Sequence, residues 1–192
     1  MNDEFFLNTT RLKIRYFNKS DYLDLYEYLS DMRTYKYEPG NSIAIDESKE
    51  FCIKRSNSKI FFAVELKTEK KQIGHIYFNI LIPESLLTYE IGYIFNQKYH
   101  ENGYATEAIK DFIKVKFSEP DIHKIISHCN PKNKPSWKLL ERLEFKREGK
   151  LRKNIFFRKD GNNNPIWLDT YEYGLLVEDI VQETNKQQSI NN

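Results

Sequence analysis

The sequence predicts a mixed α/β fold, in which a sheet is built around a β-α-β unit. Strand-like runs follow one another through residues 60–95, and the chain then alternates helix, strand and helix up to residue 143. A length of 192 residues with 40% hydrophobic content fits one domain around one sizeable core. We therefore expect a single domain over residues 1–182 and a flexible tail, rich in Gln and Asn, over residues 183–192.

The first quarter of the chain predicts one strand and two helices. Residues 9–17 alternate between apolar and polar side chains, as in a strand with one buried face. Residues 18–21 supply capping side chains for a helix that follows directly. After a break at Pro39-Gly40, a second helix is expected over residues 46–55.

The central part predicts three consecutive strands and then a helix. The strand-like runs cover residues 60–66, 73–82 and 86–95, and a charged turn between the first two indicates a hairpin. Residues 106–117 repeat apolar side chains at helical spacing.

The last part completes the alternation and ends in two strands. A short apolar strand is expected at residues 124–129 and a helix at residues 136–143. A further strand begins near residue 146, a polar turn occupies residues 159–165, and a closing strand covers residues 170–177.

Charge and cysteine content exclude several classes of protein. The 30 basic and 28 acidic residues give a net charge of +2, so we expect no nucleic-acid partner. Two cysteines and the lack of a signal-like segment predict a reducing, cytoplasmic setting. No apolar run reaches membrane-spanning length, and the four histidines lack metal-ligand spacing, so neither a membrane nor a metal is expected.

The most informative stretch is a predicted phosphate cradle at the start of a helix. The apolar strand that ends at residue 95 leads through the polar loop 100–105 directly into the helix. Such a loop presents free backbone N–H groups and the positive end of the helix dipole to an anion, and Gly103 permits close approach. The spacing matches neither the Gly-Lys-Ser/Thr loop of nucleotide triphosphatases nor the three-glycine dinucleotide fingerprint.

The loop resembles a known cofactor site. His100-x-x-Gly103-x-Ala105 is similar to the pyrophosphate loop Gln/Arg-x-x-Gly-x-Gly/Ala of the GNAT superfamily of acetyl-CoA-dependent N-acetyltransferases. His100 departs from that pattern, and because its ring is mostly neutral near pH 7 it would hold a phosphate less strongly than Arg. The resemblance extends over about residues 8–178.

A second motif points to one branch of that superfamily. Asn133-x-x-Ser136 after a strand, followed by a helix, a Leu-Glu-Phe turn and a Glu-Gly pair, is similar to the RimJ/RimL-like acetyltransferases. Glu144 stands where that branch usually has Gly, so the turn after the helix is expected to be strained.

The resemblance implies the fold in more detail. It implies a GNAT-like acyl-CoA N-acyltransferase fold, with a central, mostly antiparallel sheet, flanking helices and two splayed parallel strands. The pantetheine arm of acetyl-CoA would lie between the strands at residues 86–95 and 124–129.

The resemblance also implies two catalytic residues. Glu90, on the strand before the cradle, would be the general base, and Ser136 would donate a hydrogen bond to the departing thiolate. Other interpretations stay open at this point: Glu90 could face solvent or pair with a lysine, and Ser136 could only cap its helix.

The implied binding residues form two groups. Those expected to bind the cofactor are Ile91, Gly92, Tyr93, Ile94, His100, Glu101, Asn102, Gly103, Tyr104, Ala105, Thr106, Asn133 and Ser136. Those expected to contact the acceptor substrate are Tyr35, Tyr37, Glu38 and Asp169, although aromatic residues there often only pack and Asp169 could be a turn residue.

The function that follows is an N-acetyltransferase that moves the acetyl group of acetyl-CoA directly to a primary amine. The acceptor would be a protein N-terminus of the ribosomal-protein type or a small-molecule amine, and the protein would be a monomer or homodimer. The rival hypothesis is a regulatory module that binds coenzyme A without turnover, suggested by His100 and Glu144.

Overall fold

A computed structural model describes residues 5–180, and its eight strands form one sheet. The strand order is β1-β2-β3-β4-β5-β6-β8-β7, and every neighbouring pair is antiparallel except β5 and β6. The strands are β1 (Phe6–Asn8), β2 (Leu12–Tyr16), β3 (Phe61–Leu66), β4 (Lys71–Ile80), β5 (Thr88–Phe95), β6 (Lys124–Cys129), β7 (Lys146–Lys159) and β8 (Pro165–Leu176). The mixed sheet predicted from the sequence is therefore confirmed.

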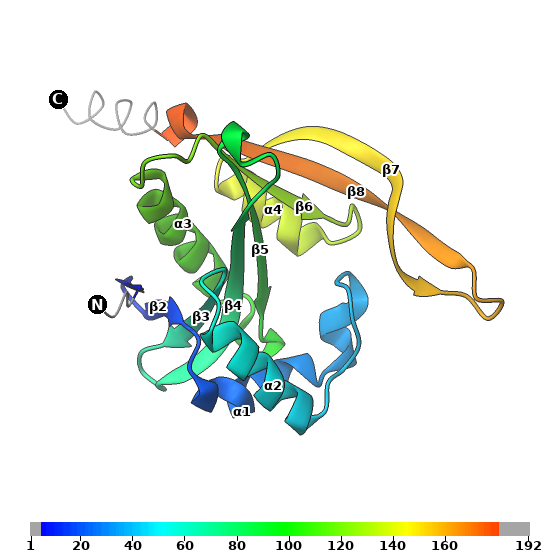
Figure 1. Ribbon diagram of the computed structural model, residues 1–192, viewed down its shortest axis with the longest axis horizontal. Coiled ribbons are helices and arrows are strands. Elements are labelled where there is room, and N and C mark those ends of the chain that lie inside the picture. Colours follow the sequence, from blue (N-terminus) through cyan, green and yellow to red (C-terminus); the bar gives the residue numbers. More distant parts are fainter. Residues whose placement is uncertain (1–4, 181–192) are drawn as a thin grey trace.

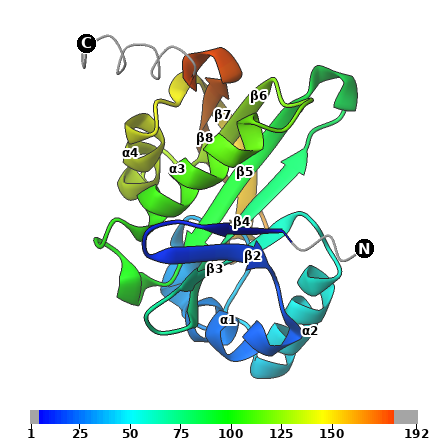
Figure 2. The same ribbon diagram turned by 90° about the vertical axis from the view of Figure 1, so that its left-hand side faces the viewer.

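Four α-helices cover the two faces of the sheet (Figures 1 and 2). They are α1 (Tyr22–Leu29), α2 (Ile45–Ser56), α3 (Tyr104–Phe117) and α4 (Lys134–Arg142). Short 3-10 helices are η1 (Lys19–Asp21), η2 (Met32–Lys36), η3 (Glu84–Leu86) and η4 (Gln97–Tyr99). None of the helices in the described part of the chain is long and apolar enough to cross a membrane.

Each face of the sheet has its own apolar core. Helices α3 and α4 bury Phe112 and Leu140 against one face, and α1 and α2 bury Leu25 and Cys52 against the other. In α3 the buried positions recur at the three- and four-residue spacing seen in the sequence. The sheet therefore lies between two layers of helices, and two of its neighbouring strands separate at one end.

The two strands that separate are β5 and β6. These parallel strands pair over three residues only, from Thr88 opposite Lys124 to Glu90 opposite Ile126. Beyond Glu90, β5 continues to Phe95 with β4 on its other edge, while β6 follows β8. The splayed parallel pair implied by the resemblance is thus present, and it leaves one edge of β5 without a strand partner.

The structure differs from the sequence-based elements at the two ends of the sheet. The short strand β1 was not predicted, because three residues are too few to show a period. Strands β7 and β8 run up to the turn that joins them, whereas the closing strand was expected only from residue 170. They form a long arm that extends away from the helices (Figure 1). The predicted tail at residues 183–192 lies outside the described residues.

Glu144 has the strained backbone that its sequence position predicted. Its φ is +65°, in the left-handed region where L side chains are disfavoured by about 1–2 kcal/mol. It follows α4 at the point where a glycine usually ends a helix. The turn is therefore made by a residue that is poorly suited to it.

Candidate active site

A cavity of about 710 Å³ opens beside the splayed end of β5. It joins the loop before α3 to the N-terminal turn of α4 and to the segment between α1 and α2. The sequence-predicted residues that line it are Tyr37, Glu38, Tyr93, Ile94, His100, Glu101, Gly103, Tyr104, Ala105, Thr106, Asn133 and Ser136. Residues far apart in the chain, predicted from separate motifs, therefore meet at one cavity.

The predicted phosphate cradle is at one end of this cavity. Gly103 precedes α3 with a φ of +77°, and the first helical hydrogen bond runs from the N–H of Glu107 to its carbonyl. The N–H groups of Tyr104, Ala105 and Thr106 consequently have no acceptor within the helix. Free N–H groups and a helix dipole in this arrangement suit an anion, and binding of a phosphate by this loop stays a prediction.

Arg11 and Glu107 hold this cradle in place, and the sequence analysis missed both. Glu107 Oε1 accepts hydrogen bonds from the Arg11 N–H at 2.7 Å and from Thr9 Oγ1 at 2.5 Å, while Arg11 Nη1 donates to the Asn102 carbonyl at 2.9 Å. Burial opposes ionisation of Glu107, but the hydrogen bonds from Thr9 and Arg11 outweigh it and lower its pKa. No local motif could reveal this, since the partners are 96 residues apart.

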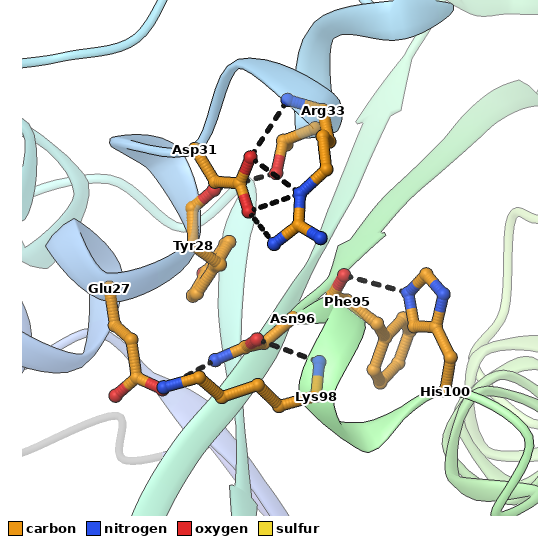
Figure 3. A network of polar contacts seen from close by, with 9 residues as sticks. Glu27, Tyr28, Asp31, Arg33, Phe95, Asn96, Lys98 and His100 are labelled. Carbon is orange, nitrogen blue, oxygen red and sulfur yellow. Dashed lines mark hydrogen bonds and ion pairs between the residues drawn. The ribbon is translucent and has the colours of Figure 1, made fainter.

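His100 has one ring nitrogen engaged with the backbone (Figure 3). Its Nε2 lies 3.0 Å from the Phe95 carbonyl oxygen. Because a carbonyl only accepts, Nε2 must carry the proton, and a neutral ring then leaves Nδ1 as an acceptor. His100 can therefore donate to a phosphate only from Nδ1 and only as an imidazolium.

The end of β5 is anchored to α1 through Glu27 (Figure 3). The Glu27 carboxylate accepts hydrogen bonds from Asn96 Nδ2 at 3.1 Å, Lys98 Nζ at 2.8 Å and Lys71 Nζ at 2.5 Å. Burial would raise its pKa, but the two lysines and Asn96 lower the pKa of Glu27 to about 2. The carboxylate thus stays ionised and fixes the start of the loop that leads to the cradle.

The cavity is lined by more cations than carboxylates. Its basic residues are Arg33, Lys36, Lys132, Lys138 and Arg142, whereas its acidic ones are Glu38 and Glu101. Arg142 also donates from Nη1 to Thr106 Oγ1 at 3.0 Å, which places a guanidinium at the first turn of α3. These basic side chains, which sequence reasoning did not single out, suit a ligand with several phosphate groups.

Ser136 contacts a half-buried tyrosine, and the residue at the N-cap of its helix is Asn133. Within residues 5–180, Ser136 Oγ lies 3.1 Å from the Tyr93 hydroxyl, which also lies 3.3 Å from the Ser136 carbonyl oxygen. The residue before α4 is Asn133, whose side chain makes no capping hydrogen bond. Burial raises the pKa of Tyr93, so its hydroxyl keeps its proton. Tyr93 and Ser136 form a connected pair of hydroxyls facing the cavity.

Glu90 is held in a chain of three polar side chains. Its Oε1 lies 2.8 Å from His128 Nδ1, and His128 Nε2 lies 3.0 Å from Glu172 Oε2. Hydrogen bonding to Glu90, opposed by burial and helped by Glu172, raises the pKa of His128. The chain joins β5, β6 and β8 just where β5 and β6 part. Glu90 does not line the large cavity, and its predicted role as general base stays a prediction.

The residues expected on the acceptor side have different surroundings. Tyr35 is buried and donates its hydroxyl to the Leu29 carbonyl at 2.9 Å, so it supports the loop and lines neither cavity. Tyr37 and Glu38 line both the large cavity and a smaller one of about 70 Å³. These two residues therefore lie between the two cavities.

Asp169 lines the smaller cavity but has partners of its own. Its carboxylate pairs with Lys150 Nζ at 2.8 Å and accepts the Lys153 N–H at 3.0 Å. The hydrogen bond from Lys150 is the largest cause that lowers the pKa of Asp169. Of the other predicted residues, Ile91, Gly92 and Asn102 do not line the large cavity.

Comparison with known proteins agrees with this geometry. The family profile described as "Acetyltransferase (GNAT) domain" matches residues 11–146. An uncharacterized N-acetyltransferase of Bacillus subtilis, YnaD, is 36% identical over 174 residues, covering 90% of this chain and 98% of that protein. The ribosomal protein uS5-alanine N-acetyltransferase of Escherichia coli is 28% identical and covers 74% of this chain and 79% of its own length.

A solved structure has the same architecture. The crystal structure of an acetyltransferase (GNAT family) from Bacillus anthracis superposes with a TM-score of 0.81 at 37% identity. The match covers 91% of this chain and 99% of that one. The overall fold is therefore shared with a related protein along nearly its whole length.

Proposed function

The chain belongs to the GNAT acetyltransferase family, and on this premise we propose that it transfers the acetyl group of acetyl-CoA directly to a primary amine. The observation that carries the proposal is a single cavity that joins an anion cradle to the Tyr93–Ser136 hydroxyl pair. An amide-forming transfer needs both features, one to bind the carrier and one to supply the leaving group with a proton.

The residues around the cavity fit acetyl-CoA. The first N–H groups of α3 and the nearby Arg142 suit the pyrophosphate, and the unpaired edge of β5 after Glu90 suits an extended chain with amide groups. Gly103 leaves the anion room to approach, since it has no Cβ and the nearest atom to an added one would be Arg11 Nη2 at 3.5 Å. Acetyl-CoA, when bound, supplies an acetyl group activated as a thioester.

The chain's own residues have two tasks in the transfer. Ser136 and Tyr93 hold a proton that passes to the sulfur as the carbon–sulfur bond breaks. Backbone N–H groups on β5 near Gly92 would polarise the acetyl carbonyl. With both hydroxyls in place, the rival hypothesis of a module without turnover is not favoured.

The acceptor is proposed at the level of its chemical class. A related enzyme acts on an alanine of ribosomal protein uS5, which supports a protein N-terminus, and a small-molecule amine is the other class that we carry forward. We place the reaction in the cytoplasm, in keeping with two buried, unpaired cysteines. A monomer or homodimer, and the lack of a nucleic-acid partner, stay predictions.

Calorimetric titration with acetyl-CoA tests the first half of the proposal. We expect binding by the wild-type protein and its loss in Gly103→Asp, which adds a negative charge to the cradle and a side chain at a positive φ. Gly161→Asp is the matched control, because a Cβ at Gly161 meets nothing within 4 Å. Failure of the well-folded wild-type protein to bind acetyl-CoA or coenzyme A would overturn the proposal.

An acceptor screen tests the second half. Thiol release from acetyl-CoA is followed with tetrapeptides that begin with Ala or Ser, the same peptides with blocked N-termini, spermidine and glucosamine. Turnover that requires a free amine supports the proposal. Binding of acetyl-CoA with no turnover on any amine would favour the rival module.

A further inference from the structure

Glu38 lies between the two cavities. It follows the 3-10 helix η2 and precedes Pro39, which favours an extended backbone at position 38. It is one of two carboxylates that line the large cavity, and it also lines the small one beside His128 and Thr170. An acceptor that reached the Tyr93–Ser136 pair from the small cavity would pass it.

The loop that carries Glu38 is held from both sides. Thr34 Oγ1 donates to the Tyr28 carbonyl at 2.6 Å, and the Tyr35 hydroxyl donates to the Leu29 carbonyl. From the arm, Arg158 Nη2 donates to the Tyr35 carbonyl at 2.9 Å. A carboxylate three residues further on is thus presented by a fixed backbone rather than by a loose loop.

Glu38 differs from Glu90, whose carboxylate is hydrogen-bonded to His128. In the described part of the chain, no hydrogen bond or ion pair engages the Glu38 carboxylate, and burial alone raises its pKa to about 7. Its charge acts on Tyr93 of β5 and Cys129 of β6, raising the pKa of each in addition to the larger effect of burial. Glu90, in contrast, is bound to His128.

The other ionisable groups around the two cavities do not neutralise Glu38. Of the basic residues in its own segment, Arg33 is paired with Asp31 at 2.5 Å and the Lys36 ammonium lies over the Tyr37 ring, 5.2 Å from its centroid. His128 is bound between two carboxylates. The charged or titratable groups that line the cavities with it are Arg33, Lys36, Tyr37, Tyr93, Tyr99, His100, Glu101, Tyr104, Lys132, Lys138, Arg142, His128, Cys129 and Asp169.

We propose that Glu38, and not Glu90, accepts the proton that the acceptor amine loses during acetyl transfer. This inference rests on the proposed function and names a residue for it. The ammonium gives one proton to the Glu38 carboxylate, and the free amine then forms the carbon–nitrogen bond at the acetyl carbonyl. As the carbon–sulfur bond breaks, the Ser136–Tyr93 pair supplies a proton to the sulfur. The second amine proton is lost to solvent, and Glu38 and the hydroxyl pair return to their starting states by exchange with water.

A base at this position gives the reaction a defined pH dependence. The carboxylate form is the active one, so kcat/KM rises with pH and levels off above the pKa of about 7. A group that must be protonated to act would instead make kcat/KM fall as the pH rises. A carboxyl with a pKa near the working pH also suits a base that must both take and release a proton.

The test compares pH profiles of kcat/KM for the wild-type protein and four variants, using an amine from the screen above. Glu38→Gln is expected to lower kcat/KM by about 10²–10⁴-fold and to abolish the rising limb near pH 7. Glu38→Asp keeps a titratable group and should retain a rising limb. Glu90→Gln and Glu50→Gln, the latter on the exposed side of α2, should both retain the limb. A rising limb that survives in Glu38→Gln, or disappears in Glu90→Gln, would overturn the inference.

A second readout does not depend on turnover. Carbon-13 NMR of protein labelled at glutamate carboxyls identifies the Glu38 signal as the one missing from Glu38→Gln. In the free protein this signal should titrate near pH 7, and titration at an ordinary glutamate value of about 4.3 would contradict the inference. Absence of turnover by the wild-type protein would overturn the proposed function and this inference with it, whereas turnover with an unchanged Glu38→Gln profile overturns the inference alone.

Discussion

The two ends of the large cavity are built in different ways. The cofactor end is centred on one continuous stretch, in which β5, the loop at Gly103 and α3 follow one another. At the acceptor end, residues of the segment between α1 and α2 line both the large cavity and the small one, and residues of β6 and of the arm formed by β7 and β8 complete the small cavity. The comparison teaches that a short motif can specify the first end, whereas the second exists only after distant segments have packed together.

The largest predicted effect is a loss of kcat when the hydroxyl pair between the two ends is changed. Ser136→Ala and Tyr93→Phe should each lower kcat by about 10²-fold, since proton transfer to the leaving sulfur is weakened. The dissociation constant for acetyl-CoA should change little. Ser56→Ala, at the end of α2, is a matched control for stability. A parallel loss of cofactor affinity would show that the pair belongs to the cofactor end.

Arg142 tests whether the cofactor end depends on charge as well as backbone. Arg142→Gln should raise the dissociation constant for acetyl-CoA by about tenfold, because a charged hydrogen bond contributes about 1.5–3 kcal/mol. The difference from wild type should shrink as salt is added. Calorimetry at two salt concentrations measures both effects, and Arg152→Gln on the exposed arm should leave affinity unaltered.

Arg158 supports the loop that carries Glu38, so replacing it tests the acceptor end. Arg158→Gln removes the hydrogen bond to the Tyr35 carbonyl, so KM for the amine should rise by about 2–10-fold, the equivalent of one net hydrogen bond. The affinity for acetyl-CoA should be unaltered. Steady-state kinetics with each substrate varied in turn provide the measurement, with the neighbouring Lys159→Gln as control. Equal changes in KM for the amine and for acetyl-CoA would show that this loop supports both ends, contrary to the prediction.

The smallest effect concerns stability alone. Glu144→Gly should raise the free energy of unfolding by about 0.5–1 kcal/mol, because glycine adopts the positive φ at this turn without strain, although it loses more entropy on folding. Urea denaturation measures the change. The same replacement inside α2, Glu50→Gly, should lower the free energy of unfolding by about 1 kcal/mol. Destabilisation by Glu144→Gly would mean that its side chain has a role at this turn.

The sequence predicted the elements whose apolar residues recur at regular spacing. The helical spacing in α3 and the alternation in β2 to β5 are properties of neighbouring residues, so these elements were placed within a few residues of their ends. The arm formed by β7 and β8 was underestimated, because its polar turn residues and exposed apolar side chains lack a regular alternation. Strand β1 is too short to show any period.

What the sequence alone determined about this protein is the cradle, the order of the elements and the strained turn at Glu144, since each depends on the conformational preferences of a few adjacent residues. The tertiary structure alone decided that Arg11 and Glu107 lock the cradle, that Glu90 is bound to His128, and that Glu38 has no partner among residues 5–180 and lines two cavities. The physical reason is that hydrogen bonds, burial and pKa values depend on partners brought together from as far as 123 residues away.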